Sequence, residues 1–294
     1  MLQRRTFLAI GASALIGRAI VASAEGAADP SRALAEIEAK SGGRLGVYAR
    51  DVGSGRAIAY RANDLFPMCS TFKILLVSAV LQRVDRRQEQ LTRHISYGKA
   101  DLEAYAPVTT AHVAEGMLTV AQLCEAAIVV SDNTAANLLL RTVGGPAGVT
   151  AFMRAHPLDD PTTRLDRNEP TLNTAIPGDR RDTTTPSRMV NALAILLTTN
   201  EVLTSSSSRM LESWMRRCKT GTTALRAGAP ASWVAGDKTG SGENATRNDV
   251  AIFRRPQRAP VIVAAYLTRA TRIGDTQREK TLAQVGRITS AALS

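Results

Sequence analysis

The sequence contains few residues of the kinds that build metal sites and disulfide frameworks. Among 294 residues there are 3 histidines and 3 cysteines, and the histidines are isolated along the chain. The cysteines, Cys69, Cys124 and Cys218, are odd in number and show no C-x-x-C spacing. We therefore expect neither a metal site nor a disulfide framework, and we expect three buried free thiols.

Aromatic residues are also scarce, at 4%, and they do not alternate with basic residues. The net charge of +11 invites a nucleic-acid interpretation, but the arginines occur singly or in adjacent pairs rather than in a basic tract. We therefore predict no nucleic-acid partner, and instead a general positive field that attracts small anionic molecules. The hydrophobic content of 44% is typical of a globular protein, and the length suffices for a sizeable core.

The sequence has no apolar run long enough to span a bilayer near its start. Arg4 and Arg5 precede an apolar stretch over residues 7–16, Arg18 interrupts that stretch, and small residues follow at 22–24. This order predicts a cleaved signal peptide over residues 1–24 and a periplasmic mature protein without a stable membrane anchor. The paired arginines favour twin-arginine export, with Sec export as the alternative.

Apolar periodicity predicts an α/β (α+β) fold in which both ends of the chain build one antiparallel sheet. Helical patterns cover residues 31–41 and 275–293, and most of residues 65–214 is also helical in pattern. Extended runs occupy residues 45–50, 57–61, 232–238, 250–253 and 261–267. We expect an α/β domain from residues 25–62 plus 216–294, flanked by its own helices, an inserted all-helical domain over 63–215, and an active site between them.

The clearest chemical motif is Ser70-Thr71-Phe72-Lys73. A spacing of three places the serine and the lysine on one helical face, and Pro67 upstream favours a helix that begins near Ser70. Free N–H groups and the positive end of the helix dipole converge there, and a lysine on an apolar helix loses hydration, which lowers its pKa. The motif predicts an activated serine, but S-x-x-K also occurs by chance, so the interpretation depends on partners elsewhere.

Further polar clusters follow in the sequence, and they are Ser131-Asp132-Asn133, Arg167-Asn168-Glu169-Pro170-Thr171-Leu172-Asn173 and Lys238-Thr239-Gly240. With the Ser70 motif, and in this order, they make the chain resemble a class A serine β-lactamase over essentially its whole mature length. The resemblance implies the serine β-lactamase/penicillin-binding-protein fold, hydrolysis of penicillin- and cephalosporin-type antibiotics, no cofactor and a monomer.

The resemblance also implies catalytic roles for the residues of these motifs. Ser70 is expected to attack the lactam carbonyl, with its proton going either to Lys73 or to Glu169 through a water. Ser131 is expected to pass a proton to the departing lactam nitrogen. The oxyanion hole implied is the backbone N–H of Ser70 together with that of Ser241.

Substrate binding is implied for residues that would surround the carboxylate and the side chain of a β-lactam. A cation and hydroxyls would hold the carboxylate, an asparagine the acyl-amide group, and an aromatic would form a wall of the cleft. The residues expected at the carboxylate are Lys238, Thr239, Gly240, Ser241 and Arg247. Asn133 is expected to hold the acyl-amide group, and Tyr105 to form the wall. As alternatives, Arg247 could lie in an exposed turn and Tyr105 could be an ordinary loop aromatic.

Glu169 separates the rival functions. By the resemblance, Glu169 with Asn173 positions the water that hydrolyses the acyl-enzyme, in a loop closed by an Arg167–Asp182 ion pair and a cis bond before Pro170. A penicillin-binding transpeptidase lacks this base and keeps a long-lived acyl-enzyme. A peptidoglycan D,D-peptidase and a penicillin-sensing domain are therefore the alternative functions.

Overall fold

The computed structural model describes residues 29–294, so the predicted signal peptide lies outside the described residues. Within this part of the chain, five strands form an antiparallel sheet in the order β2-β1-β9-β8-β7. Their bounds are β2 (Ala57–Tyr60), β1 (Arg44–Asp51), β9 (Arg258–Thr268), β8 (Thr246–Arg255) and β7 (Val234–Gly242). The N-terminal strands thus join the C-terminal ones through the β1–β9 pair.

Both faces of the sheet are covered by helices. Successive residues of a strand point to opposite faces, so they pack into two different cores. Along β8, Val250 and Ile252 belong to the core on the helical side of the sheet. Ala251 and Phe253 belong to a second core on the other side. This double burial accounts for the nearly continuous apolar runs in the middle of β8 and β9.

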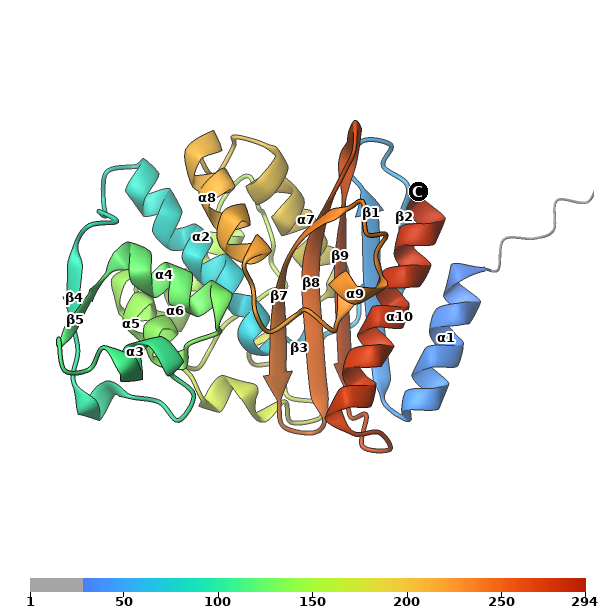
Figure 1. Cartoon of the computed structure of the whole chain (residues 1–294), viewed down its shortest axis with the longest axis horizontal. Helices are drawn as coiled ribbons and strands as arrows, with labels where there is room; N and C mark the ends of the chain where they lie inside the picture. The colour runs from blue at the N-terminus through green and yellow to red at the C-terminus, as the bar shows by residue number, and fades with distance from the viewer. Residues whose placement is uncertain (1–28) are drawn as a thin grey trace, which may run out of the picture.

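The terminal helices α1 (Pro30–Ser41) and α10 (Asp275–Leu293) cover the second core, together with the short α9 (Leu225–Gly228). They lie on the outer side of the sheet in Figure 1. The α1 helix begins where the Asp29 side chain accepts the Ser31 N–H, and it ends at Gly42 with φ of 65°.

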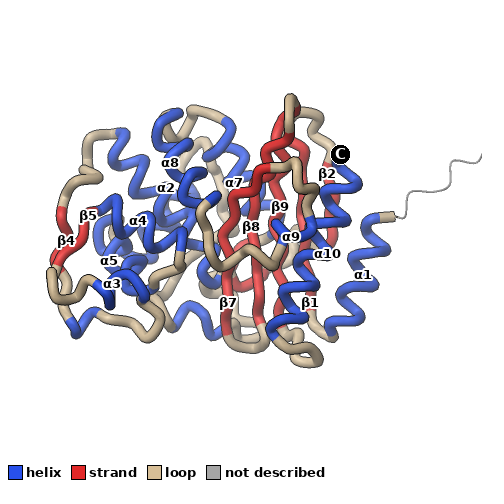
Figure 2. Tube along the Cα trace, viewed as in Figure 1, coloured by secondary structure: helices blue, strands red, loops and turns tan. Residues whose placement is uncertain are grey.

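The remaining helices lie on the other side of the sheet (Figures 1 and 2). They are α2 (Phe72–Asp85), α3 (Pro107–Ala111), α4 (Val120–Val129), α5 (Asn133–Thr142), α6 (Gly145–Arg154), α7 (Pro186–Thr198) and α8 (Ser205–Arg216). The 3₁₀ turns η1 (Cys69–Thr71), η2 (Lys99–Asp101) and η3 (Thr171–Thr174) connect them. Residues 72–81 of α2 are all buried, so α2 is the central helix of this half.

The predicted fold class is confirmed, and the structure adds detail to the segment 63–215. Besides helices it contains two short strand pairs, β3 (Phe66–Pro67) with β6 (Thr183–Thr184) and β4 (His94–Ser96) with β5 (Met117–Thr119). Such strands are too short to show a period of two. Among the described residues, no helix has the length and apolar character needed to cross a membrane.

Candidate active site

Ser70 lies in the 3₁₀ turn η1, directly before α2, rather than in the first turn of the α-helix itself. Cys69, the residue before it, has φ of 46°, in the left-handed region that non-glycine residues rarely adopt. Strand β7 passes close by at Gly240, where an added Cβ would lie 3.2 Å from the Ser70 nitrogen and 2.8 Å from the Met68 oxygen. Glycine at this position therefore permits the close approach.

Lys73, three residues after Ser70, is wholly buried, in keeping with the desolvation that the motif predicts. Its Nζ lies 2.9 Å from Glu169 Oε1, in an ion pair whose two side chains are both 0% exposed. It also donates to the Ser131 carbonyl at 2.8 Å and to Asn133 Oδ1 at 2.6 Å. Burial lowers the pKa of Lys73 below its usual value, although the negative charge of Glu169 opposes this shift.

Ser131 lies in the turn between α4 and α5, with φ of 61°. Its Oγ is 3.3 Å from Lys73 Nζ and 3.0 Å from Lys238 Nζ, so the hydroxyl bridges two ammonium groups. Burial lowers the pKa of Lys238 to about 8, and the charge of Lys73 adds to this effect. Asp132 begins α5 by accepting the Ala135 N–H, which fixes the turn.

The Glu169 carboxylate points at the nucleophile, with Oε1 3.4 Å from Ser70 Oγ. The Asn173 side chain donates to its other oxygen, Oε2. Asn137 brackets the Glu169 backbone by donating to its carbonyl at 2.9 Å and accepting its N–H at 3.0 Å. The peptide bond between Glu169 and Pro170 is cis, as the resemblance implies.

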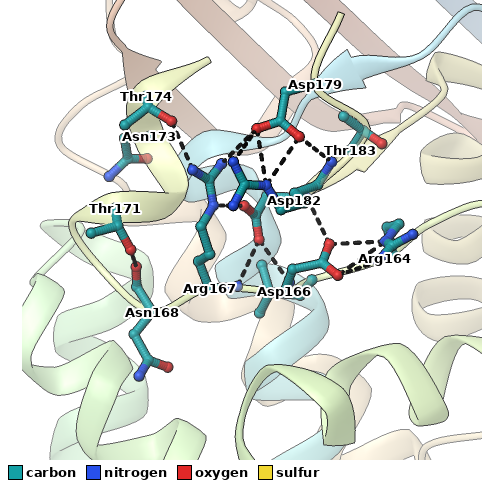
Figure 3. A network of polar contacts seen from close by, with 12 residues as sticks. Arg164, Asp166, Arg167, Asn168, Thr171, Asn173, Thr174, Asp179, Asp182 and Thr183 are labelled. Atoms are coloured by element: carbon teal, nitrogen blue, oxygen red, sulfur yellow. Dashed lines mark hydrogen bonds and ion pairs between the residues drawn. The ribbon is translucent and has the colours of Figure 1, made fainter. Parts of the chain in front are cut away.

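Residues 164–182, here called the Glu169 loop, are closed by a second charged network (Figure 3). Arg167 Nε lies 2.5 Å from the fully buried Asp182 carboxylate. Asp182 Oδ1 also accepts the backbone N–H of Asp166 at 2.7 Å and of Arg167 at 3.0 Å. The predicted pair is thus present, and it joins the two ends of the loop.

The predicted substrate residues surround a cleft of about 350 Å³ at the boundary between the sheet and the helices. Its lining consists of Ser70, Tyr105, Ser131, Asn133, Asn173, Thr220, Thr239, Ser241 and Arg247. Lys73, Glu169 and Lys238 lie directly beneath this surface through the contacts described above. The structure therefore brings together every side chain that the motifs singled out for catalysis and binding.

Arg247 lies within strand β8, so the alternative of an exposed turn is wrong, and its side chain is 14% exposed. It donates to Ser241 Oγ at 2.6 Å and to the Thr220 carbonyl at 2.8 Å, and it pairs with Glu279 at 2.7 Å. Tyr105, 51% exposed, lines the cleft.

Sequence reasoning missed three residues of this site. Thr220 lines the cleft and contacts Thr239 Oγ1 at 2.5 Å, Asn137 holds the Glu169 backbone, and Glu279 pairs with Arg247. None belongs to a motif with its own chemistry. A signal exists for Asn137 alone, since it follows Asn133 by one helical turn on the same face of α5.

No group of histidine, cysteine, aspartate and glutamate suited to a metal occurs in residues 29–294. The three cysteines are buried free thiols in this part of the chain. Burial raises the pKa of Cys69 well above its usual range, which disfavours the thiolate next to Ser70.

Comparison with known proteins gives a consistent result. The sequence model of the Beta-lactamase enzyme family matches residues 29–293. Beta-lactamase AST-1 of Nocardia asteroides is 48% identical over 243 residues, covering 83% of this chain and 76% of that protein.

Solved structures show the same similarity. A class A beta-lactamase of the last common ancestor of Gram-negative bacteria (GNCA4) has a TM-score of 0.87 and 54% identity, over 91% of this chain and 100% of that one. An ancestral (GNCA) class A beta-lactamase has a TM-score of 0.86 and 53% identity, over 90% and 99%. The chain therefore belongs to the beta-lactamase enzyme family, and it is a class A serine β-lactamase that hydrolyses β-lactam antibiotics.

Proposed function

We propose that this enzyme opens the β-lactam ring through an acyl-enzyme on Ser70 and releases the product with a water activated by Glu169. The observation that carries the proposal is a buried carboxylate that lies against both the nucleophilic hydroxyl and a buried ammonium. Glu169 Oε1 lies 3.4 Å from Ser70 Oγ and 2.9 Å from Lys73 Nζ. A base within reach of both the nucleophile and an attacking water can serve either half-reaction.

For acylation, two bases are compatible with this geometry. Lys73, one helical turn after Ser70 and paired with Glu169, can take the Ser70 proton in its neutral form, which its lowered pKa makes accessible. Glu169 can take it through a water. The ester forms as the C–N bond of the ring breaks, and Ser131 passes a proton to the departing nitrogen from its position between Lys73 and Lys238.

For deacylation, a water attacks the ester carbonyl and Glu169 takes its proton; the bond to the Ser70 oxygen then breaks as that proton is passed to the oxygen. Asn173 and Asn137 hold the Glu169 carboxylate and backbone, and the Arg167–Asp182 pair stabilises the loop that carries them. The N–H groups of Ser70 and Ser241 form the oxyanion hole for the tetrahedral intermediate of each step.

The substrate carboxylate binds at the Lys238 end of the cleft. There the Lys238 ammonium, the hydroxyls of Thr239 and Ser241, and Arg247 offer charge-assisted hydrogen bonds. Gly240 keeps β7 close to Ser70, Asn133 holds the acyl-amide group, and Tyr105 covers the entrance.

We further propose that the enzyme works as a monomer in the periplasm after export and removal of residues 1–24. The paired arginines of that segment favour the twin-arginine route. We also retain the division into a 25–62 plus 216–294 domain and a 63–215 domain. Hydrolysis of β-lactams at this location protects the cell wall enzymes that these antibiotics acylate.

Substitution of the nucleophile tests the proposal. Ser70→Ala is expected to reduce the turnover of a chromogenic cephalosporin by at least about 10³-fold, since loss of a covalent nucleophile leaves only the remaining binding groups. The exposed Ser54→Ala serves as the matched control and should retain full activity. Substantial turnover by Ser70→Ala would refute the acyl-enzyme on this residue.

A further inference from the structure

Asn248 is a buried polar side chain on the face of strand β8 that packs against the helices. It lies on the same face as Val250 and Ile252, which pack into the helical core, and it is 0% exposed. A buried amide on such a face requires hydrogen-bond partners. Its partners show what this side chain does.

The Asn248 amide holds the chain that leads into the nucleophile. Its Nδ2 donates to the Pro67 carbonyl at 2.8 Å and to the Met68 carbonyl at 3.2 Å. Among the described residues its Oδ1 has no partner. The reverse orientation would set an oxygen against two carbonyl oxygens, so the chemistry fixes which atom faces the turn.

The same side chain also fixes strand β7 relative to that turn. Asn248 is the direct cross-strand partner of Gly240, and Arg247 is the partner of Ser241. Cross-strand partners face the same side, and a Cβ at Gly240 would indeed meet the Met68 oxygen to which Asn248 donates. Asn248 therefore ties the β7–β8 pair to the backbone two and three residues before Ser70.

We propose that Asn248 is a positioning residue that sets the spacing between the backbone N–H groups of Ser70 and Ser241. This rests on the proposed oxyanion hole, whose two donors come from separate elements, η1 and β7. Cys69, the first residue of η1, holds a left-handed conformation, and the Met68 carbonyl also accepts a hydrogen bond from Thr71 Oγ1 at 2.8 Å. Without the Asn248 amide, the turn keeps its internal hydrogen bond but loses its link to the strand pair.

Asn248→Leu removes both hydrogen bonds at similar side-chain volume. We expect kcat/KM for a chromogenic cephalosporin to fall by about 10- to 100-fold, less than the loss of a complete oxyanion donor. The inhibition constant of phenylboronic acid, whose tetrahedral adduct with a serine places an oxygen in such a hole, should rise in parallel. Asn248→Ala provides the same test if the leucine variant does not yield folded protein.

Val250→Ala is the matched control, since it lies on the same face of β8 and is equally buried. It should lower the midpoint of thermal unfolding while leaving kcat and boronate affinity unchanged within about twofold, because it breaks no link to the turn. If folded Asn248 variants keep wild-type boronate affinity, or lose activity only as far as Val250→Ala does, the proposal is wrong.

Infrared spectroscopy of the acyl-enzyme separates the positioning role of Asn248 from the proposed roles of Ser70 and Glu169. In a Glu169→Ala background the ester should accumulate, and adding Asn248→Leu should raise its C=O stretching frequency because weaker hydrogen bonds polarise the carbonyl less. An ester of unchanged frequency overturns the role of Asn248 alone. An ester that is hydrolysed in the Glu169→Ala background as fast as in the wild-type enzyme overturns the proposed role of Glu169 instead.

Discussion

The two charged networks of the active-site half, the catalytic cluster (Lys73, Ser131, Glu169 and Lys238) and the ion pairs of the Glu169 loop, differ in how they treat protons. In the catalytic cluster, burial lowers the pKa of both lysines despite nearby anions and acceptors. In the loop, the Arg181 guanidinium lowers the pKa of Asp179 to about 2 and thereby fixes its charge. Desolvation exceeds pairing in the first network, and pairing exceeds desolvation in the second.

The comparison shows how one structure can combine side chains that transfer protons with ion pairs that keep a loop in place. A lysine poised by burial can accept and release a proton within the working pH range. A carboxylate fixed by arginine stays charged throughout that range and supplies a constant constraint. The Glu169 side chain belongs to the first network, while its backbone is carried by the loop that the second network closes.

The largest expected effect comes from removing a proton carrier. Lys73→Ala should reduce the rate of acylation by about 10³-fold, because it removes a candidate base and leaves the buried Glu169 without its ion-pair partner. Stopped-flow measurement of acylation by a chromogenic cephalosporin gives the rate. Lys40→Ala, exposed on α1, is the control and should acylate like wild type. Equal rates for both variants would contradict a catalytic role for Lys73.

Removing the main clamp of the Glu169 loop is the next largest change. Arg167→Ala leaves the buried Asp182 with backbone donors alone, so we expect a loss of about 2 kcal/mol of unfolding free energy and slower deacylation. Urea denaturation and single-turnover kinetics measure the two effects. Arg164→Ala breaks a pair that is 46% exposed on the arginine side, and it should cost less than about 1 kcal/mol. Equal losses in the two variants would refute the distinction.

The lowered pKa of Lys238 predicts a pH dependence of substrate capture. The ammonium is charged below a pKa of about 8, and its charge, with the attraction for a carboxylate, is lost as pH rises through that value. We expect kcat/KM for benzylpenicillin to fall by about tenfold between pH 7 and pH 9. Lys238→Arg should remove this fall, since a guanidinium stays charged. The methyl ester of benzylpenicillin has no carboxylate, so its kcat/KM should not fall through loss of the Lys238 charge. An identical fall for the ester would rule out Lys238 as its cause.

The smallest effect should come from the rim of the second network. Arg181 is exposed, and Asp179 also lies 3.8 Å from Arg167. Because the pKa of Asp179 is lowered, the stability it contributes is present above a pH of about 4 and lost as pH falls toward 2. That contribution is present at pH 7, but the Arg181 side chain is exposed and solvent screens the pair, so Arg181→Ala should shift the thermal midpoint at pH 7 by no more than about 1 °C, as calorimetry would show. A larger shift would mean that the exposed Arg181–Asp179 pair is a main stabilising contact of the Glu169 loop.

The sequence identified the residues whose chemistry lies in contiguous motifs. The spacing of Ser70 and Lys73 indicates one helical face, whereas Glu169 and Asn173 are assigned through the resemblance of their short run to the class A motif. Asn248, Asn137 and Thr220 act through contacts between segments far apart in the chain. Such contacts leave no local pattern, because an isolated asparagine or threonine is compatible with many environments.

The same reasoning applies to the fold. The long strands β8 and β9 and the helix α10 were predictable because their burial extends over many residues. The β4–β5 pair, with three residues in each strand, was missed because tertiary contacts rather than periodicity define it. Helix α6 was harder to predict. It begins at Gly145 with a proline in its first turn, and such a composition is also typical of a chain reversal.

The most direct test of the account is mass spectrometry of the purified protein mixed with benzylpenicillin, followed over time beside Glu169→Ala. We predict rapid formation of the hydrolysed product by wild type with little retained adduct, and accumulation of a stable adduct on Ser70 in the variant. This result would assign deacylation to Glu169. A stable adduct on the wild-type protein, or equal turnover by the variant, would contradict that assignment and favour a penicillin-binding protein or sensor in the first case.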